Sequence, residues 1–131
     1  MHRLALLVGG FLGAILRYQI SIMIPTNNGF PLSTLLINIV GCFTLGWFLT
    51  FTSIRWRISK EIQIGISTGL IGAFTTFSTF SVENISLLLA HQYGLSAAYI
   101  CLSIGLGIGF TYVGSKLAQY PNKSKGGAEQ G

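Results

Sequence analysis

Charged side chains are scarce in this sequence of 131 residues, which has eight Lys and Arg and three Asp and Glu. A typical soluble domain carries charge on about a quarter of its residues, because it needs a polar surface. Here half of the residues are hydrophobic, and the mean hydropathy is +0.64. The composition excludes an ordinary soluble domain and indicates that the lipid bilayer is the solvent.

Cysteines are also few, and motifs for metal binding or catalysis are lacking. Cys42 and Cys101 are the two cysteines; both lie in apolar runs, and neither belongs to a Cys-x-x-Cys pair or a His/Cys cluster. We find no nucleophile–base set, cofactor motif or ATP motif, so we expect no enzyme activity. The net charge of +5 comes from few basic residues, as is normal for membrane-protein loops, so nucleic acid is not an expected partner.

Four apolar runs are each long enough to cross about 30 Å of hydrocarbon as a helix. They cover approximately residues 4–24, 32–51, 61–90 and 95–117. The first run has no signal-peptide cleavage pattern after it, so we expect it to be retained. The sequence therefore predicts an all-α membrane protein with four transmembrane helices. Residues 1–118 form one domain, and residues 119–131 form a polar tail that is expected to be disordered.

The third run is too long for one straight crossing, because a helix of about 30 residues measures about 45 Å. Its middle, residues 72–81, reads GAFTTFSTFS. Gly72 and the β-branched pair Thr75 and Thr76 lower helix propensity there, so we expect the third helix to be broken at its middle. Broken helices commonly offer carbonyls to a cation, but two carbonyls from one chain are too few for a hard cation. The break therefore predicts a dimer with its axis through this stretch.

Basic residues are distributed unevenly between the two ends of the predicted bundle. The connectors 25–31 and 91–94 contain no Lys or Arg. The opposite end holds both termini and the connector 53–60, and its basic residues are Arg3, Arg55, Arg57, Lys60, Lys116, Lys123 and Lys125. Because cytoplasmic loops are enriched in Lys and Arg, both termini are predicted to be cytoplasmic.

Several polar side chains lie within the predicted spans. Arg17 either reaches the headgroups along its flexible stem or attracts anions from inside the span. Asn38 either makes an interhelical hydrogen bond or donates to an anion. Glu83 is either a proton or cation site or is held by nearby hydroxyls. Tyr99 and Ser103 lie four residues apart and share a helix face, although Ser103 can also bond back to its own helix.

Small residues recur at intervals of four in three of the runs, a pattern that lets helices pack closely. The pairs are Gly9/Gly13, Gly65/Gly69 and Gly105/Gly109.

Phenylalanine recurs at Phe74, Phe77 and Phe80, which gives an aromatic stripe. We expect Phe74 to pack in the core. A phenyl ring has a positive edge, so Phe77 and Phe80 can favour a small anion without holding it tightly. Ion conduction needs that balance between entry and exit.

Three segments of the sequence resemble the fluoride channel family (Fluc, also called CrcB). They are GGFLGAILRY at 9–18, PLSTLLINIVG at 31–41 and GLIGAFTTFSTFSVE at 69–83, and the resemblance covers roughly residues 3–118. It implies a small four-helix protein in the bacterial cell membrane that exports cytoplasmic fluoride passively and confers fluoride resistance. It also implies an antiparallel dimer with two fluoride pathways and a central sodium ion.

Matched by motif, the resemblance also implies roles for individual residues. The backbone carbonyls of Gly72 and Thr75 would hold sodium. The fluoride pathway would be formed by Asn38, Phe77, Phe80, Tyr99 and Ser103, with Arg17 at a vestibule. Many members continue this polar track with another hydroxyl where this chain has Gly107.

Alternatives to a homodimeric channel follow from the same sequence. The charge bias favours a heterodimer with a paralogous subunit of opposite orientation, because an antiparallel homodimer inserts both ways and needs balanced loops. A small four-helix multidrug transporter is a second alternative, but that class relies on an acid in the first span, where this chain has Arg17. A membrane assembly subunit without transport activity is a third.

Overall fold

The computed structural model describes residues 2–24, 29–56 and 58–120, and the regular elements in these ranges are all helices. The three long helices are α1 (His2–Met23), α2 (Leu32–Ile54) and α6 (Tyr93–Gln119). The chain between α2 and α6 is divided into α3 (Lys60–Ile64), the π-helix η1 (Gly65–Ile71), α4 (Gly72–Phe74) and α5 (Phe77–Leu89). Residues 121–131, most of the predicted tail, lie outside the described residues.

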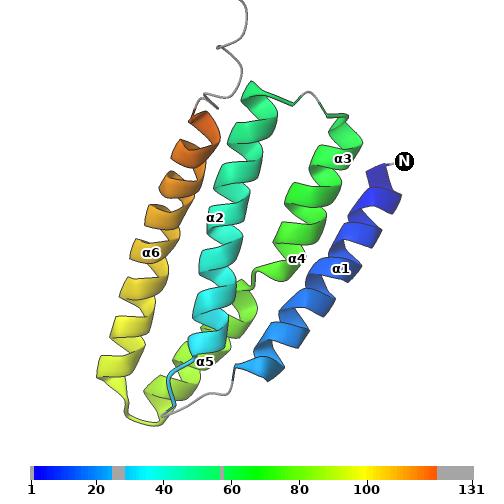
Figure 1. The fold of residues 1–131 in the computed structure, drawn as a ribbon. Coiled ribbons are helices and arrows are strands. Elements are labelled where there is room, and N and C mark those ends of the chain that lie inside the picture. The colour runs from blue at the N-terminus through cyan, green and yellow to red at the C-terminus, as the bar shows by residue number, and fades with distance from the viewer. Residues whose placement is uncertain (1, 25–28, 57, 121–131) are drawn as a thin grey trace, which may run out of the picture.

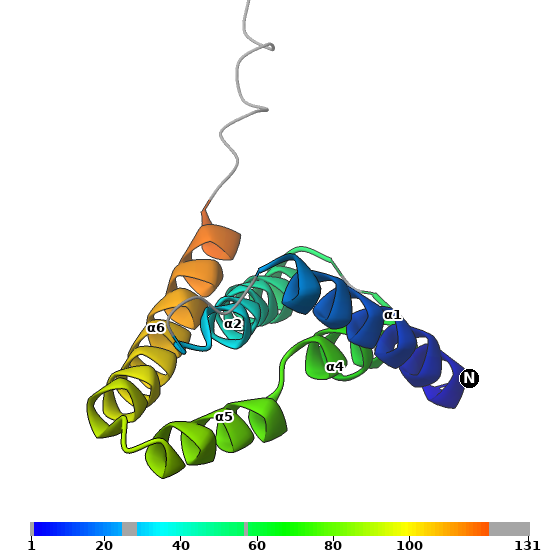
Figure 2. The same cartoon turned by 90° about the horizontal axis from the view of Figure 1, so that it is seen from below.

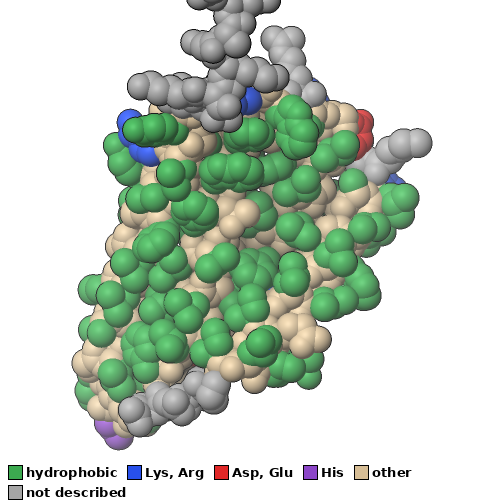
Figure 3. Space-filling model, in the orientation of Figure 1, with side chains coloured by type: hydrophobic (Ala, Val, Ile, Leu, Met, Phe, Trp, Pro, Cys, Tyr) green, Lys and Arg blue, Asp and Glu red, His purple; other side chains and the backbone are tan. Residues whose placement is uncertain are grey.

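Within the described residues, three stretches are long and apolar enough to cross a membrane: Arg3–Met23, Leu32–Ile54 and Tyr93–Gln119. Hydrophobic side chains cover the face seen in Figure 3 along most of its length, while Lys and Arg gather at one end of it. This distribution is typical of a surface in contact with lipid. The prediction of an all-helical protein with these three spans is confirmed.

The helices lie side by side, and the beginning of α1 and the last turns of α2 and α6 lie at the same end (Figure 1). Viewed along the bundle, α6, α2 and α1 form a curved row, with α4 and α5 on its concave side (Figure 2). Helix α2 packs most extensively against α6, and α1 packs against η1 and α4.

Glycines allow the closest helix approaches in this arrangement. A Cβ at Gly13 of α1 would collide with the Leu70 carbonyl of η1, and a Cβ at Gly46 of α2 would collide with the Thr111 carbonyl of α6. Gly105 and Gly109, in contrast, have no atom within 4 Å of a Cβ built on them. The predicted close approach at this third glycine pair is therefore wrong within the chain.

Helical geometry is interrupted between α4 and α5. Thr75 (φ −75°, ψ 156°) and Thr76 (φ −146°, ψ 125°) have extended backbones. Helix α5 then begins at Phe77, where the Thr76 Oγ1 atom accepts a hydrogen bond from the Thr79 N–H group at 3.2 Å and caps the helix. These two residues fall within the GAFTTFSTFS stretch.

The contact between α1 and η1 generates a stability prediction. We expect Gly13→Ala to lower the midpoint of thermal unfolding in detergent, because the added methyl group meets backbone atoms that cannot move aside locally. Overpacking of this kind typically costs about 1–3 kcal/mol.

Gly10→Ala is the matched control, because nothing lies within 4 Å of a Cβ at that position on the same helix. It should leave the midpoint unchanged or raise it slightly, since Ala favours helix over Gly. Equal midpoints for the two variants would contradict the packing described.

Candidate functional site

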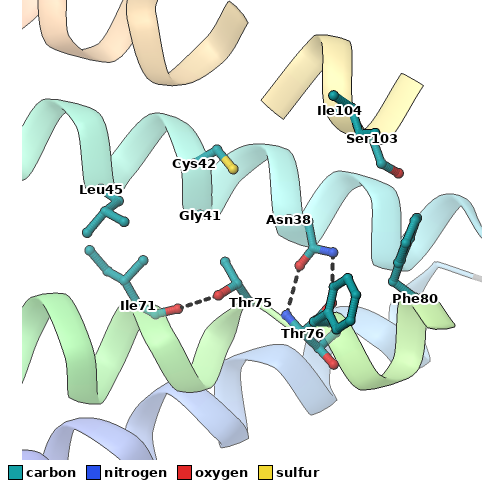
Figure 4. Close-up of a pocket in the computed structure, with 11 residues that line it drawn as sticks. Asn38, Gly41, Cys42, Leu45, Ile71, Thr75, Thr76, Phe80, Ser103 and Ile104 are labelled. Carbon is teal, nitrogen blue, oxygen red and sulfur yellow. Dashed lines mark hydrogen bonds between the residues drawn. The ribbon is translucent and has the colours of Figure 1, made fainter. Parts of the chain in front are cut away.

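The side chain of Asn38 forms hydrogen bonds with the backbone at the interruption. Its Nδ2 atom donates to the Thr76 carbonyl at 3.0 Å, and its Oδ1 atom accepts from the Thr76 N–H group at 2.8 Å (Figure 4). One side chain of α2 thus satisfies both backbone groups of a residue that has left the helix. Because an amide nitrogen carries two N–H bonds, Asn38 keeps one further donor.

Backbone carbonyls lose their helical donors at the same place, and those of Gly72 and Thr75 are among them. In a continuous helix, the Thr76 and Thr79 N–H groups would donate to the carbonyls of Gly72 and Thr75. Here the Thr76 N–H group donates to Asn38 Oδ1, and the Thr79 N–H group donates to Thr76 Oγ1. The oxygens of Gly72 and Thr75 are therefore released from the helical pattern, as carbonyls offered to a hard cation must be.

A pocket of about 350 Å³ lies at the interruption, between α2, α6 and the segment that includes Thr75 and Thr76. The labelled residues in Figure 4 converge on it from these elements. Most of its lining is apolar. The lining residues are Asn38, Gly41, Cys42, Leu45, Ile71, Thr75, Thr76, Phe77, Phe80, Ser103 and Ile104.

Phe77 and Phe80 lie next to each other on α5, with ring centroids 5.8 Å apart and planes inclined by 35°. Phe80 is half-buried, whereas 78% of Phe77 is exposed. Both rings line the pocket, so this chain alone covers Phe77 only in part.

Tyr99, Glu83 and Thr34 form a polar cluster behind Phe80. Tyr99 is fully buried, and its ring centroid lies 5.0 Å from that of Phe80. The Tyr99 hydroxyl donates to Glu83 Oε2 at 2.7 Å, and the Thr34 hydroxyl donates to Glu83 Oε1 at 2.8 Å. The carboxylate is thus held by hydroxyls, one of the two alternatives for Glu83, and the cluster fixes the ring on which Phe80 packs.

Ser103 lies in the pocket wall, and its Oγ atom is buried without a hydrogen-bond partner in the described part of the chain. It therefore does not bond back to its own helix, as Thr111 does to the Gly107 carbonyl. A buried hydroxyl without a partner calls for a bound water or ion.

The remaining predicted residues do not lie in the pocket wall. Tyr99 is behind Phe80, Gly72 is exposed, and Arg17 is a half-buried residue of α1. The pocket thus brings together Asn38, Thr75, Phe77, Phe80 and Ser103 and leaves Arg17, Gly72 and Tyr99 outside its lining.

Several residues of the site are absent from the predicted set, among them Thr34, Thr76 and Cys42. Thr76 has a local signal, because a threonine directly before a new helical segment is a typical N-cap. Thr34 has none, since its partner Glu83 lies 49 positions away. Cys42 reads as an ordinary apolar residue in sequence.

The described residues contain no group of three or more His, Cys, Asp and Glu side chains that could hold a metal ion. A Cβ built on Gly72 would have only the Ser67 carbonyl within 4 Å, at 3.8 Å, so the backbone is open at that point.

Comparison with known proteins gives consistent matches over most of the chain. The chain is 46% identical over 122 residues to a protein of Oceanobacillus iheyensis named fluoride-specific ion channel FluC, covering 93% of this chain and 95% of the relative. It is 42% identical over 127 residues to fluoride-specific ion channel FluC 1 of Moorella thermoacetica, covering 95% and 91% of the two chains. A Bacillus cereus protein, also named fluoride-specific ion channel FluC 1, is 46% identical over 111 residues, covering 79% and 81%.

The family model described as "CrcB-like protein, Camphor Resistance (CrcB)" matches residues 4–115, which include the three long helices almost entirely and the whole pocket. Together with the three membrane-spanning helices, this match makes the chain a multi-pass membrane protein. The chain belongs to the CrcB family.

Proposed function

We propose that this protein is a fluoride-selective ion channel that lets cytoplasmic fluoride leave the cell passively and so confers fluoride resistance. The observation that carries the proposal is the pocket at the helix interruption, where an amide donor, a hydroxyl and two phenyl rings meet in an apolar wall. Its membership of the CrcB family and the names of its relatives support the same function. An inside-negative potential favours anion exit by about 2.3 kcal/mol per charge per 100 mV.

The pocket side chains suit a small anion that must bind and leave again. Asn38 has one amide N–H left after bonding to Thr76, and the Ser103 hydroxyl has no protein partner in the described chain. The edges of Phe77 and Phe80 offer weak positive potential between these donors. Tyr99 supports Phe80 from behind, and Arg17 raises anion concentration at a vestibule.

The segment from α3 to α5 forms the third membrane crossing in chain order as a broken helix, beside α1, α2 and α6. Its parts before the interruption have 5, 7 and 3 residues, and α5 after it has 13. The interruption therefore lies near the middle of the crossing. A two-fold axis in the membrane plane brings two such interruptions to the same depth, which is the geometry of an antiparallel dimer.

A second copy of the fold, either identical or a paralogue, covers the exposed face of α5. Phe77, Ser78 and Thr79 are exposed near the middle of this crossing. The Ser78 and Thr79 hydroxyls lie 3.3 and 3.0 Å from Thr76 Oγ1. Each keeps further hydrogen-bonding capacity, which hydrocarbon cannot satisfy and a partner helix can. The partner also encloses the open side of the pocket.

A sodium ion at the dimer centre is held by the carbonyls of Gly72 and Thr75 from each subunit. These oxygens are among those that the interruption releases from helical hydrogen bonds. Four carbonyls give a hard cation the oxygen ligands that one chain lacks. The ion stabilises the centre electrostatically, and we assign it no part in moving fluoride.

Both termini lie in the cytoplasm, because the basic residues gather at that end of the bundle. Arg3, Arg55, Lys60 and Lys116 are the described ones, and all four are exposed. This strong bias favours one orientation for the chain. The bias therefore favours a paralogue of opposite charge bias over an identical copy as the antiparallel partner.

The ring of Phe80 provides the most direct test of the pathway. We expect Phe80→Ile to slow fluoride efflux from liposomes by about tenfold or more, which corresponds to about 1.4 kcal/mol in the barrier. The aliphatic side chain fills similar space but lacks the positive ring edge.

Phe11→Ile is the control, because Phe11 is 67% exposed on α1 and does not line the pocket. Its efflux should match that of the unchanged protein. Equal efflux from the Phe80→Ile and Phe11→Ile variants would count against a fluoride path along α5.

The sodium proposal predicts an ion-dependent stability. Purified protein in a sodium buffer should unfold at a higher temperature than in N-methylglucamine at equal ionic strength. A ligand at 100 times its Kd stabilises the folded state by about 2.7 kcal/mol. The same midpoint in both buffers would exclude a bound sodium ion that contributes to stability.

The orientation proposal is tested by expressing a tagged chain without any paralogue. Single cysteines are introduced near each terminus of the Cys-free protein and labelled from the outside of intact cells. Both termini should be protected from the label, which places them in the cytoplasm. A mixture of the two orientations would refute the heterodimer and favour a homodimer.

A further inference from the structure

Cys42 is a free thiol in the wall of the pocket. It lies one helical turn after Asn38 on α2, so both side chains share one face of that helix. Cys42 is half-buried, and its sulfur points from α2 toward the side of the pocket where Ser103 and Ile104 of α6 lie (Figure 4).

The space next to Gly107 of α6 is occupied by this sulfur. The Cys42 Sγ atom lies 3.6 Å from the position that a Cβ at Gly107 would take, and no other atom outside the local helix lies within 4 Å of it. Ser103 and Gly107 are one turn apart on α6 and share a face. The thiol therefore stands beside the position that follows Ser103 along this face.

The hydroxyl groups near this position already donate hydrogen bonds to backbone carbonyls. Thr111, one turn beyond Gly107, donates to the Gly107 carbonyl at 2.8 Å. Thr44, near Cys42 on α2, donates to the Val40 carbonyl at 2.7 Å. Cys42 is thus the polarizable group that the pocket offers next to Gly107.

The buried, unpartnered Ser103 hydroxyl is a second and independent sign that the pocket accepts a ligand. Its Oγ atom is shielded from solvent and has no acceptor in the described chain. Figure 4 shows this hydroxyl directed toward the Phe80 ring, inside the group of residues that surrounds the pocket.

We propose that the Cys42 thiol forms part of the wall of the ion path, in the space beside Gly107, and that it is a site at which small thiol-directed reagents block the path. This inference rests on the proposed fluoride channel and assigns it a further wall residue. The S–H group is a weak donor, which suits a wall that must release the anion. Cys101, on α6, is exposed and does not line the pocket.

The probe is methyl methanethiosulfonate, which is small and uncharged. The thiol of Cys42 loses its proton to solvent, and the thiolate attacks the sulfenyl sulfur of the reagent. A disulfide bond forms between Cys42 and the methylthio group, the sulfur–sulfonyl bond breaks, and methanesulfinate leaves with the electron pair. The added group occupies pocket volume that an ion would otherwise cross.

The experiment compares fluoride efflux from liposomes before and after treatment for the unchanged protein, Cys101→Ala and Cys42→Ala. We expect treatment to slow efflux about tenfold or more, or about 1.4 kcal/mol in the barrier, in the first two proteins. The Cys42→Ala protein should keep its own rate from before treatment. Mass spectrometry of the same samples measures labelling at each cysteine.

Three results would overturn the inference alone, provided that efflux before treatment is normal. The first is unchanged efflux from treated Cys101→Ala although Cys42 is fully labelled. The second is loss of efflux from treated Cys42→Ala. The third is a Cys42 thiol that reacts only after denaturation in SDS. Absence of efflux before treatment in every protein would instead overturn the proposed function, and this inference with it.

Discussion

The two hydrogen bonds between the Asn38 amide and the backbone of Thr76 are the constraint on which the rest of the site depends. An extended residue inside a membrane helix leaves an N–H and a carbonyl that hydrocarbon cannot satisfy. Asn38 satisfies both from the neighbouring helix α2. Because it takes the Thr76 N–H group, the Gly72 carbonyl loses its helical donor, while the Thr76 side chain removes the donor of Thr75 by capping α5.

The same interruption determines where the pocket lies and what lines it. Helix α5 begins at Phe77 and therefore presents Phe77 and Phe80 to the pocket. Close packing then makes the position of Phe80 specific, because its ring rests on Tyr99, which is fixed by Glu83. The same departure from helical geometry thus frees the carbonyls of Gly72 and Thr75 and places the rings of Phe77 and Phe80 at the pocket.

Sequence reasoning reaches those features that local patterns encode. Hydropathy predicts the three long helices to within a few residues, and Gly72, Thr75 and Thr76 identify the stretch that contains the non-helical residues. Asn38, Gly41 and Leu45 are spaced three and four residues apart on α2, and all three line the pocket. Tyr99 and Ser103 share a helix face as well, but the neighbouring ring of Phe80 leaves Tyr99 outside the lining.

Contacts between distant residues are beyond such patterns. Nothing near Asn38 indicates that its partner is Thr76, 38 positions away, and nothing near Thr34 points to Glu83. Glycine spacing is ambiguous for the same reason. Gly9/Gly13 does mark a close helix contact and Gly105/Gly109 does not, while the contact at Gly46 has no paired signal in its own helix.

Fluoride and chloride efflux from liposomes containing the purified protein, alone and with a paralogous partner, is the measurement that tests the central claim most directly. An apolar pocket with few weak donors should pass the small fluoride ion and exclude chloride. The account predicts rapid fluoride efflux in at least one of the two preparations, with chloride retained in both. No fluoride efflux in either preparation, or equal efflux of both anions, would contradict it.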